Sequence, residues 1–527
     1  MPKTKTVAKT RRVAKTKPVA KTTPVAKKRP IAKTRPVAKK RPVAKKTPAA
    51  KTPAAKTRPV ATPKRARAST GGKDSPSAVQ TRLRGVAELA LAQLAKLGVD
   101  SAEVSVAVGH ELEVSVRKSE VELVKEAGSS GLSVRVIRDG RVATSSTTDF
   151  GRESIVAFVR RAVEMAEVSE QDPLAAPPAA KELAKRWPTL ELFDAQTDRI
   201  GADEAIALAR RAEAAALAAD DRITASEGAS FSRTSGHSVL ATSGGFLGDR
   251  SGTYQSVAVQ AIADDVGGKK RSGVWWTGGR FFAELEPPEE VGREAARRAI
   301  RQLGAIKFDT GVVPVVFDKD AARAIIGLVA SCVLGDSVYR ERSYLAPKLG
   351  KRVASKLVTL VDDPLLPRGP GSRAFDGEGR PVAPITVCAK GVLKSFLLDT
   401  YSARKLGKAP TGSAGGGGGI PHASTSNFYM LAGESAPADL LKGIERGLYV
   451  HRMMGFGFDP TTGNFSRGAE GLLIENGELT VPIGESTISR NLDELLQGID
   501  AVGSDLDHRT ATSAPSFRVD QMTVAGQ

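Results

Sequence analysis

The histidines are the first residues to consider, because a metal centre or a general base would most often draw on them. Five are present, and no two are spaced to share a helix face or to form a pair of metal ligands: His110, His237, His422, His451 and His508. His110-Glu111 begins like a zinc-protease motif, but Val114 and Val116 stand where a second histidine would be needed, and the segment alternates like a strand. Each histidine is therefore predicted to be a core or surface residue, and a metal site assembled from these scattered side chains is the alternative.

Signatures of nucleophilic catalysis and of phosphate binding are incomplete in this sequence. Gly335-Asp-Ser-Val-Tyr339 is the nearest approach to a nucleophile elbow, and it lacks the final glycine. The glycine run Gly415–Gly419 is not followed by Gly-Lys-Ser/Thr, so it is predicted to be a flexible loop and not a P-loop.

The cysteines and the paired acidic residues do not indicate a catalytic or metal site either. Cys332 and Cys388 are too few for a disulfide framework, and both lie in apolar patterns, so they are predicted to be packing residues. Asp362-Asp363 and Glu289-Glu290 flank prolines and are predicted to be solvated turn or helix-start residues.

The chain begins with a segment of extreme charge. The first 73 residues contain 25 Lys or Arg and no acid; because the whole chain carries +20, residues 74–527 carry −5. Prolines recur every six residues from Pro18 to Pro48, which predicts a disordered, extended tail similar to the Lys/Ala/Pro tails of linker histones. We expect it to bind nucleic acid without sequence preference, or else to serve as a spacer that touches any polyanion. The basic clusters proposed for this contact are Lys27, Lys28, Arg29, Lys39, Lys40, Arg41, Lys45 and Lys46.

The elements of residues 74–527 predict an α+β protein. Helices are expected at about 77–97, 153–167, 202–219, 288–303 and 318–334. Short antiparallel strands are expected at 104–108, 112–116 and 132–137, further strands within 223–265, and a buried strand at 312–317 followed mostly by strands. Asp139-Gly140 and Asn476-Gly477 are hairpin turns by composition.

Three segments follow from this pattern. They are a basic tail at 1–73, a mixed α/β domain at 74–305 and a β-rich domain at 306–527. Neither a secretory signal nor an apolar run of about 18 residues is present, so we expect a cytoplasmic protein, with nucleoid association through the tail as the further expectation.

Several ordered blocks in the second half resemble the PmbA (TldE) branch of the TldD/PmbA family, also called peptidase U62 or modulators of DNA gyrase. The blocks are Val338-Tyr-Arg-Glu-Arg-Ser-Tyr-Leu, Lys348-Leu-Gly-Lys-Arg, Leu397-Leu-Asp-Thr-Tyr-Ser-Ala-Arg-Lys-Leu-Gly, Gly463-Asn-Phe-Ser-Arg-Gly-Ala-Glu-Gly, Glu475-Asn-Gly-Glu and Met522-Thr-Val-Ala-Gly-Gln. The resemblance covers about residues 77–527 and implies the fold of that family: a mixed α/β N-terminal domain and a β-rich C-terminal domain. The basic tail lies outside it.

The family's catalytic subunits, of TldD type, carry a His-Glu-x-x-x-His helix and a C-terminal cysteine ligand for zinc. In this sequence Ile326, Gly327 and Ser331 occupy the corresponding positions, and residues 509–527 contain no cysteine. A catalytic zinc needs three protein ligands and usually a base, so no metal, cofactor or catalytic residue is expected in this chain. The helix is expected to pack through Ile325, Ile326, Val329 and Val333 instead.

The resemblance implies a non-catalytic subunit in a hetero-oligomer, a heterodimer in the family, with a TldD-type partner that holds the zinc and processes small or unfolded polypeptides. Exposed strand edges could hold such a polypeptide by strand addition, and Tyr339, Arg340, Asn427 and Arg467 are the residues proposed for peptide or partner contact. Two alternatives stay open: a metallopeptidase in its own right, and a nucleoid-associated protein whose function lies in the tail.

Overall fold

A computed structural model describes residues 75–416 and 419–526. Residues Gly71–Gln527 form one compact unit by their residue contacts. The predicted basic tail, with its lysine and arginine clusters, lies outside the described residues, and the boundary predicted at residue 305 stays a prediction.

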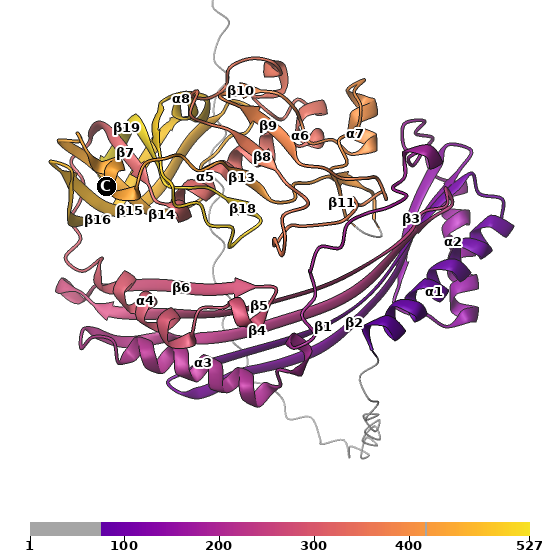
Figure 1. The fold of residues 1–527 in the computed structure, drawn as a ribbon, viewed down its shortest axis with the longest axis horizontal. Coiled ribbons are helices and arrows are strands. Elements are labelled where there is room, and N and C mark those ends of the chain that lie inside the picture. Colours follow the sequence, from indigo (N-terminus) through magenta and orange to yellow (C-terminus); the bar gives the residue numbers. More distant parts are fainter. Residues whose placement is uncertain (1–74, 417–418, 527) are drawn as a thin grey trace, which may run out of the picture. The chain divides into compact units, whose positions relative to one another are not determined.

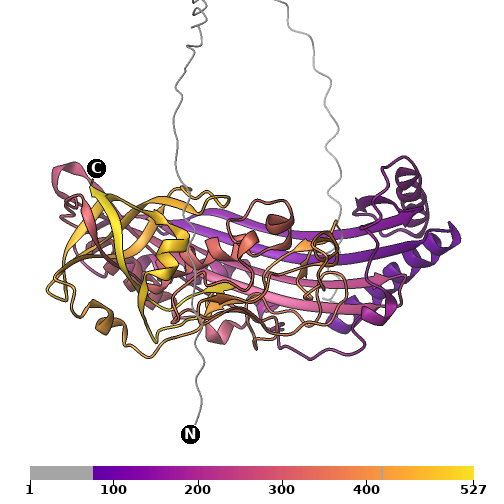
Figure 2. The same cartoon turned by 90° about the horizontal axis from the view of Figure 1, so that it is seen from above.

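The first half of this unit is built on a six-stranded antiparallel sheet in the order β3-β2-β1-β4-β5-β6. Its long strands curve alongside the C-terminal half, as Figures 1 and 2 show from two sides. The strands are β1 Ser101–Arg117, β2 Glu120–Arg138, β3 Arg141–Thr147, β4 Ile223–Thr242, β5 Leu247–Asp264 and β6 Lys270–Gly279.

Four helices cover one face of this sheet because side chains alternate along a strand. In β1, Val104 and Val106 pack with α1 and α2, whereas Leu112, Val114 and Val116 on the same face pack with α3 and α4. The helices are α1 Pro76–Lys96, α2 Arg152–Glu167, α3 Ala202–Leu217 and α4 Pro288–Ile300. All four agree with the predicted helices.

One strand prediction is wrong. The runs at 104–108 and 112–116 are not two strands but one, β1, which passes unbroken through Gly109. Gly109 pairs with Ser129 on one side and with Gly236 on the other. A Cβ at Gly109 would lie 3.1 Å from the Ser129 hydroxyl, so small residues on three strands keep the ladder intact where the hydrophobic alternation lapses.

Both predicted hairpin turns are confirmed. Asp139 and Gly140 join β2 to β3 with φ of 50° and 69°, and Asn476 and Gly477 join β15 to β16 with φ of 52° and 82°. Positive φ at both central residues matches the right-handed twist of the flanking strands.

The C-terminal half contains a second six-stranded sheet, in the order β16-β15-β14-β7-β19-β17. An additional pairing between β16 and β19 closes five of these strands into a barrel. The strands are β7 Gly311–Phe317, β14 Arg446–Met454, β15 Asn464–Glu475, β16 Glu478–Asn491, β17 Ile499–Val502 and β19 Phe517–Gly526.

A smaller mixed sheet, β10-β9-β8-β13-β18, lies beside the barrel. Its strands are β8 Leu360–Asp362, β9 Ile385–Ala389, β10 Val392–Leu393, β13 Phe428–Met430 and β18 Thr512–Ser513. The remaining elements of this half are α5 Lys319–Cys332, α6 Gly335–Tyr339, α7 Thr400–Lys405, α8 Leu492–Gln497, β11 Ala414–Gly415 and β12 His422–Ala423.

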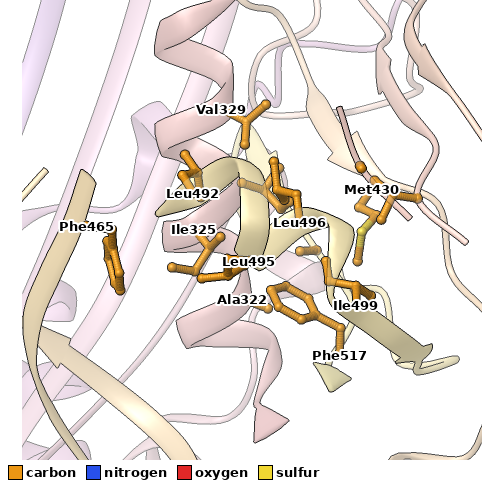
Figure 3. Packing of buried hydrophobic residues seen from close by; sticks show 14 of the residues in the cluster. Ala322, Ile325, Val329, Met430, Phe465, Leu492, Leu495, Leu496, Ile499 and Phe517 are labelled. Atoms are coloured by element: carbon orange, nitrogen blue, oxygen red, sulfur yellow. The ribbon is translucent and has the colours of Figure 1, made fainter. Parts of the chain in front are cut away.

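Helix α5 packs one apolar face into the C-terminal core. Ile325 and Val329 lie against Leu492, Leu495 and Leu496 in this core (Figure 3). Ile326 and Val333 are also completely buried. The predicted packing face is therefore confirmed, and Cys332 and Cys388 are buried in the same core, where burial raises the pKa of each thiol to about 11.

Arginines of the first half bind carbonyls of the second. Arg280, after β6, donates to the carbonyls of Gly369 and Pro370 at 3.0 and 2.8 Å, and Arg250 on β5 donates to that of Phe375 at 2.6 Å. The two halves are thus fixed to each other along the side of the sheet that the four helices leave open.

Two further expectations change with the structure. Asp362 is not solvated: it is 1% exposed and accepts hydrogen bonds from the backbone and hydroxyl of Ser426. Gly415 is buried in β11 and pairs with His422, whereas residues 417 and 418 of the predicted flexible loop lie outside the described residues. Glu289 and Glu290 begin α4 as expected.

Within the described ranges, no helix is long and apolar enough to cross a membrane.

Candidate functional site

A cavity of about 740 Å³ lies where β6 meets α5. Its walls come from five consecutive residues of β6, from the end of α4, from α5, from β14 and β15, and from residues 510–512. The first and second halves of the fold therefore build it jointly.

Strand β6 borders the cavity as the last strand of its sheet. Its outer main-chain edge pairs with no other strand among the described residues, although the Ser272 carbonyl accepts from Gln302 Nε2 at 2.9 Å. Gly273 lets α4 cover β6 closely, since a Cβ there would lie 2.1 Å from the carbonyl oxygen of Ala295. An edge strand that borders a cavity offers N–H and C=O groups to an extended polypeptide.

Trp275 on β6 carries two stacked arginines. The guanidinium carbons of Arg298 and Arg509 lie 4.0 and 4.1 Å from its ring centroid. Its indole N–H donates to Glu286 at 2.9 Å. Cation–π contacts of this kind hold an aromatic wall in place and keep positive charge at the cavity.

Arginine dominates the charge of the walls: four arginines, Arg298, Arg323, Arg452 and Arg467, stand against one acid, Asp320. Asp320 lies 3.3 Å from Arg298 and 3.7 Å from Arg323. Arg452 lies 3.4 Å from Glu470.

Arg467 differs from these three arginines. The residue is half-buried; in the described part of the chain it makes no ion pair, and its buried Nε has no hydrogen-bond partner. Burial alone lowers the pKa of Arg467, and the Phe465 ring lies 6.0 Å from its guanidinium carbon. A guanidinium with unused donors at a cavity wall can bind an anionic or carbonyl oxygen.

His451 also lines the cavity, from a β-bulge in β14. Val450 pairs with Gly471 and Arg452 with Glu470, so His451 is the extra residue between them. A bulge redirects its side chain toward the cavity wall, a common arrangement next to binding sites. Gly471 makes room for the backbone of the bulge, because a Cβ at this position would lie 1.9 Å from the Tyr449 carbonyl oxygen.

His451 is neutral. It is 7% exposed, and burial, with the nearby cations Arg301, Arg298 and Arg452, lowers its pKa to about 3. Its Nε2 has no hydrogen-bond partner among the described residues. The other four histidines are exposed or half-buried. No local pattern in the sequence indicates that His451 faces a cavity.

Tyr254 connects this cavity with a second one of about 430 Å³ on the inner face of β4 and β5. Tyr254 lines the second cavity, and its hydroxyl lies near enough to Arg323 of the first cavity and Arg280 of the second to interact with both electrostatically. The two cavities are therefore neighbours along the open face of the first sheet.

The four residues predicted for peptide or partner contact do not lie together. Arg467 lines the cavity at β6. Tyr339, at the end of α6, lines a separate cavity of about 790 Å³, and Arg340 is exposed beside it, 5.1 Å from the Tyr339 ring. Asn427 is 1% exposed: it donates to the Asp363 carbonyl and the Ser372 hydroxyl and accepts from Gly371, so contact through it would break these bonds.

The positions that correspond to the zinc motif do not converge. Ile326 points into the core, whereas Gly327 and Ser331 lie on the opposite side of the helix. The Ser331 hydroxyl donates to the Leu328 carbonyl at 2.7 Å, and nothing approaches a Cβ at Gly327 more closely than Thr512 at 4.0 Å. These residues do not fit a metal, and residues 75–416 and 419–526 contain no group of three His, Cys, Asp or Glu that could hold one.

Comparison with protein families gives three consecutive matches. Residues 102–166 match the PmbA/TldA metallopeptidase domain 1, residues 196–303 the central domain, and residues 310–526 the C-terminal domain.

Two curated PmbA relatives match this chain over nearly their full length, and a TldD relative matches over part of its length. The metalloprotease PmbA of Escherichia coli O157:H7 is 36% identical over 436 residues, 82% of this chain and 94% of that protein. A PmbA homologue of Haemophilus influenzae is 33% identical and covers 85% of this chain and 97% of its own. A TldD homologue from the same organism is 30% identical over 49% of this chain and 59% of its own.

Solved structures share the fold. A candidate modulator of DNA gyrase from Bacteroides thetaiotaomicron is 27% identical and superposes with a TM-score of 0.79, covering 84% of this chain and 99% of its own. TldE from Thermococcus kodakarensis, 19% identical, gives a TM-score of 0.75 over 84% of this chain and all of its own.

Proposed function

The chain belongs to the PmbA/TldD metallopeptidase family, and from this membership we propose that it is a non-catalytic, PmbA/TldE-like subunit of a zinc metallopeptidase complex. A TldD-type partner would carry the zinc and cut small or unfolded polypeptides. This chain would hold the polypeptide as an added strand on β6 and complete the hetero-oligomer.

The observation that carries this proposal is the character of α5. In this helix, which borders the cavity, Gly327 and Ser331 stand where the family's catalytic subunits have a glutamate and the second histidine. Ile326, at the position of the first histidine, is buried in the core. Without a base or ligands at these positions, the chain lacks the groups that would activate water on zinc. The main-chain edge of β6 still supports binding, because strand addition reads backbone and not side chains.

The proposal is tested by combining the full-length chain with the TldD-type subunit of the same organism. Size-exclusion chromatography with light scattering should show a hetero-oligomer, and peptidase activity should need both chains. A chain that never associates with that subunit would refute the role proposed here.

A second function is proposed for residues 1–73 because of their charge. We propose that this segment binds DNA or RNA without sequence preference and brings the complex to the nucleoid in the cytoplasm. Affinity should fall steeply with salt, by about 0.9 log units per phosphate neutralised for each tenfold rise in salt, and should vanish when residues 1–73 are deleted. Binding that survives the deletion would assign the nucleic-acid contact to residues 74–527.

A further inference from the structure

We propose that the cavity between β6 and α5 recognises a carboxylate of the bound polypeptide, either an acidic side chain or the C-terminal carboxylate. This inference rests on the proposed function, because it assumes that an extended chain lies along β6. It adds a specificity to that site: polypeptides that carry a carboxylate near the held segment bind more tightly than neutral ones.

The first support is the balance of charge. Four arginines and one aspartate line the cavity. Three of these arginines are engaged with three acids: Arg298 with Glu294 and Asp320, Arg323 with Asp320, and Arg452 with Glu470. Arg467 thus leaves one positive charge at the wall without a matching acid.

The second support is the set of unused polar atoms. Arg467 Nε and His451 Nε2 are buried and have no hydrogen-bond partner among the described residues. Buried polar groups are nearly always paired, so two unpaired groups at one cavity point to a ligand or to water there. His451 is 7% exposed and neutral, so it offers a ring nitrogen without adding charge.

The two side chains come from neighbouring strands. Met453 on β14 pairs with Ala469 on β15. Arg467 lies two residues before Ala469 on its strand, and His451 lies two residues before Met453 on the other. Residues two apart on a strand share a face, so Met453 and Arg467 point the same way, and all three line the cavity.

A carboxylate fits this site better than a phosphate group of a nucleic acid. The same cavity exposes the main-chain edge of β6, which an extended polypeptide can pair with and a nucleic acid cannot. A planar guanidinium also binds a carboxylate through two parallel hydrogen bonds.

The test uses the full-length chain and three fluorescent peptides of one extended sequence. The first is neutral with a C-terminal amide, the second has a free C-terminal carboxylate, and the third has one internal Glu and a C-terminal amide. Fluorescence anisotropy should show that at least one carboxylate peptide binds about tenfold more tightly than the neutral peptide. Whether the second or the third gains affinity identifies the source of the carboxylate.

The Arg467→Ala variant should lose this preference, so that its affinities for the carboxylate and neutral peptides become equal, while Arg467→Lys should restore part of the difference. Arg446→Ala is the matched control, since Arg446 is an exposed, ion-paired arginine on β14 that lies outside the cavity. Thermal unfolding of each variant separates lost recognition from lost folding.

Three results would overturn the inference. Equal affinities for all three peptides would leave the peptide-holding function standing without the specificity. If none of the three peptides binds, both the peptide-holding function and the carboxylate specificity are wrong. Inorganic phosphate or a short oligonucleotide that competes as well as the carboxylate peptide would assign the positive wall to phosphate.

Discussion

The two sides of α5 show how one helix can lose a catalytic role and keep a structural one. Ile325, Ile326 and Val329 form a fully packed face against α8 and the barrel. On the other side Arg323 lines the cavity, Gly327 leaves open space, and Ser331 is exposed. Stability therefore depends on the first side, and substitutions on the second side should affect binding more than folding.

The largest effect is expected on the packed side. Ile326→Ala should lower the free energy of unfolding by about 2–5 kcal/mol, because the removed side chain leaves a cavity in a core that cannot fully collapse. Chemical denaturation of the variant and the wild type measures this. A loss below about 1 kcal/mol would show that this side of α5 is loosely packed.

The next effect lies at the start of the same helix. Asp318 accepts a hydrogen bond from the Ala321 backbone at 2.9 Å, and burial raises its pKa to about 7. In the unfolded chain the pKa of an Asp is about 4, so the folded state binds the proton more tightly and stability falls as pH rises from about 4 to about 7.

Asp318→Asn should remove this fall and keep the helix cap. The variant should match the wild type at pH 5 and exceed it by about 2–4 kcal/mol at pH 8, as measured by denaturation at both pH values. A wild type as stable at pH 8 as at pH 5 would show that Asp318 is ionised within the fold.

A small gain is expected on the cavity side. Gly327→Ala should raise the free energy of unfolding by about 0.5–1 kcal/mol, because alanine favours a helix and nothing lies within 4 Å of the new methyl group except Thr512 at 4.0 Å. Because Ile326→Ala, at the neighbouring position, should lower the free energy of unfolding, the two substitutions should change stability in opposite directions on the two sides of the helix. A destabilised Gly327→Ala variant would mean that this side is packed as well.

The smallest effect is expected at Ser331. Its hydroxyl donates to the Leu328 carbonyl and lies 4.0 Å from the Cys332 sulfur, both in its own helix, and the residue is exposed, so Ser331→Ala should change stability by less than about 0.5 kcal/mol. The same denaturation series measures it, and a larger loss would assign Ser331 a contact that the fold does not explain.

The sequence predicts the local elements well because their signals are local. The helix at α5, its apolar face and the hairpin at Asn476-Gly477 all follow from periodicity and turn chemistry. The unbroken strand β1 does not follow from such local signals. Gly109 is tolerated within it because Ser129 and Gly236 lie beside it on the neighbouring strands.

The cavity is harder to predict for the same reason. His451 faces it because of a bulge that depends on the register between β14 and β15, and Asp362 is buried because Ser426 is available to bond it. The pair Trp275-Trp276, which lies between Gly273 and Gly278, is a local sequence feature that could have drawn attention to β6. Only Arg467 among the predicted contact residues reaches the cavity, because sequence blocks do not reveal which side of a strand faces which wall.

The most direct test of the central claim is the zinc content and peptidase activity of the purified full-length chain, alone and with its TldD-type partner. We expect no stoichiometric zinc and no cleavage by the chain alone, and cleavage by the pair with zinc bound to the partner. One zinc per chain, with cleavage by the lone chain that a chelator abolishes, would contradict it.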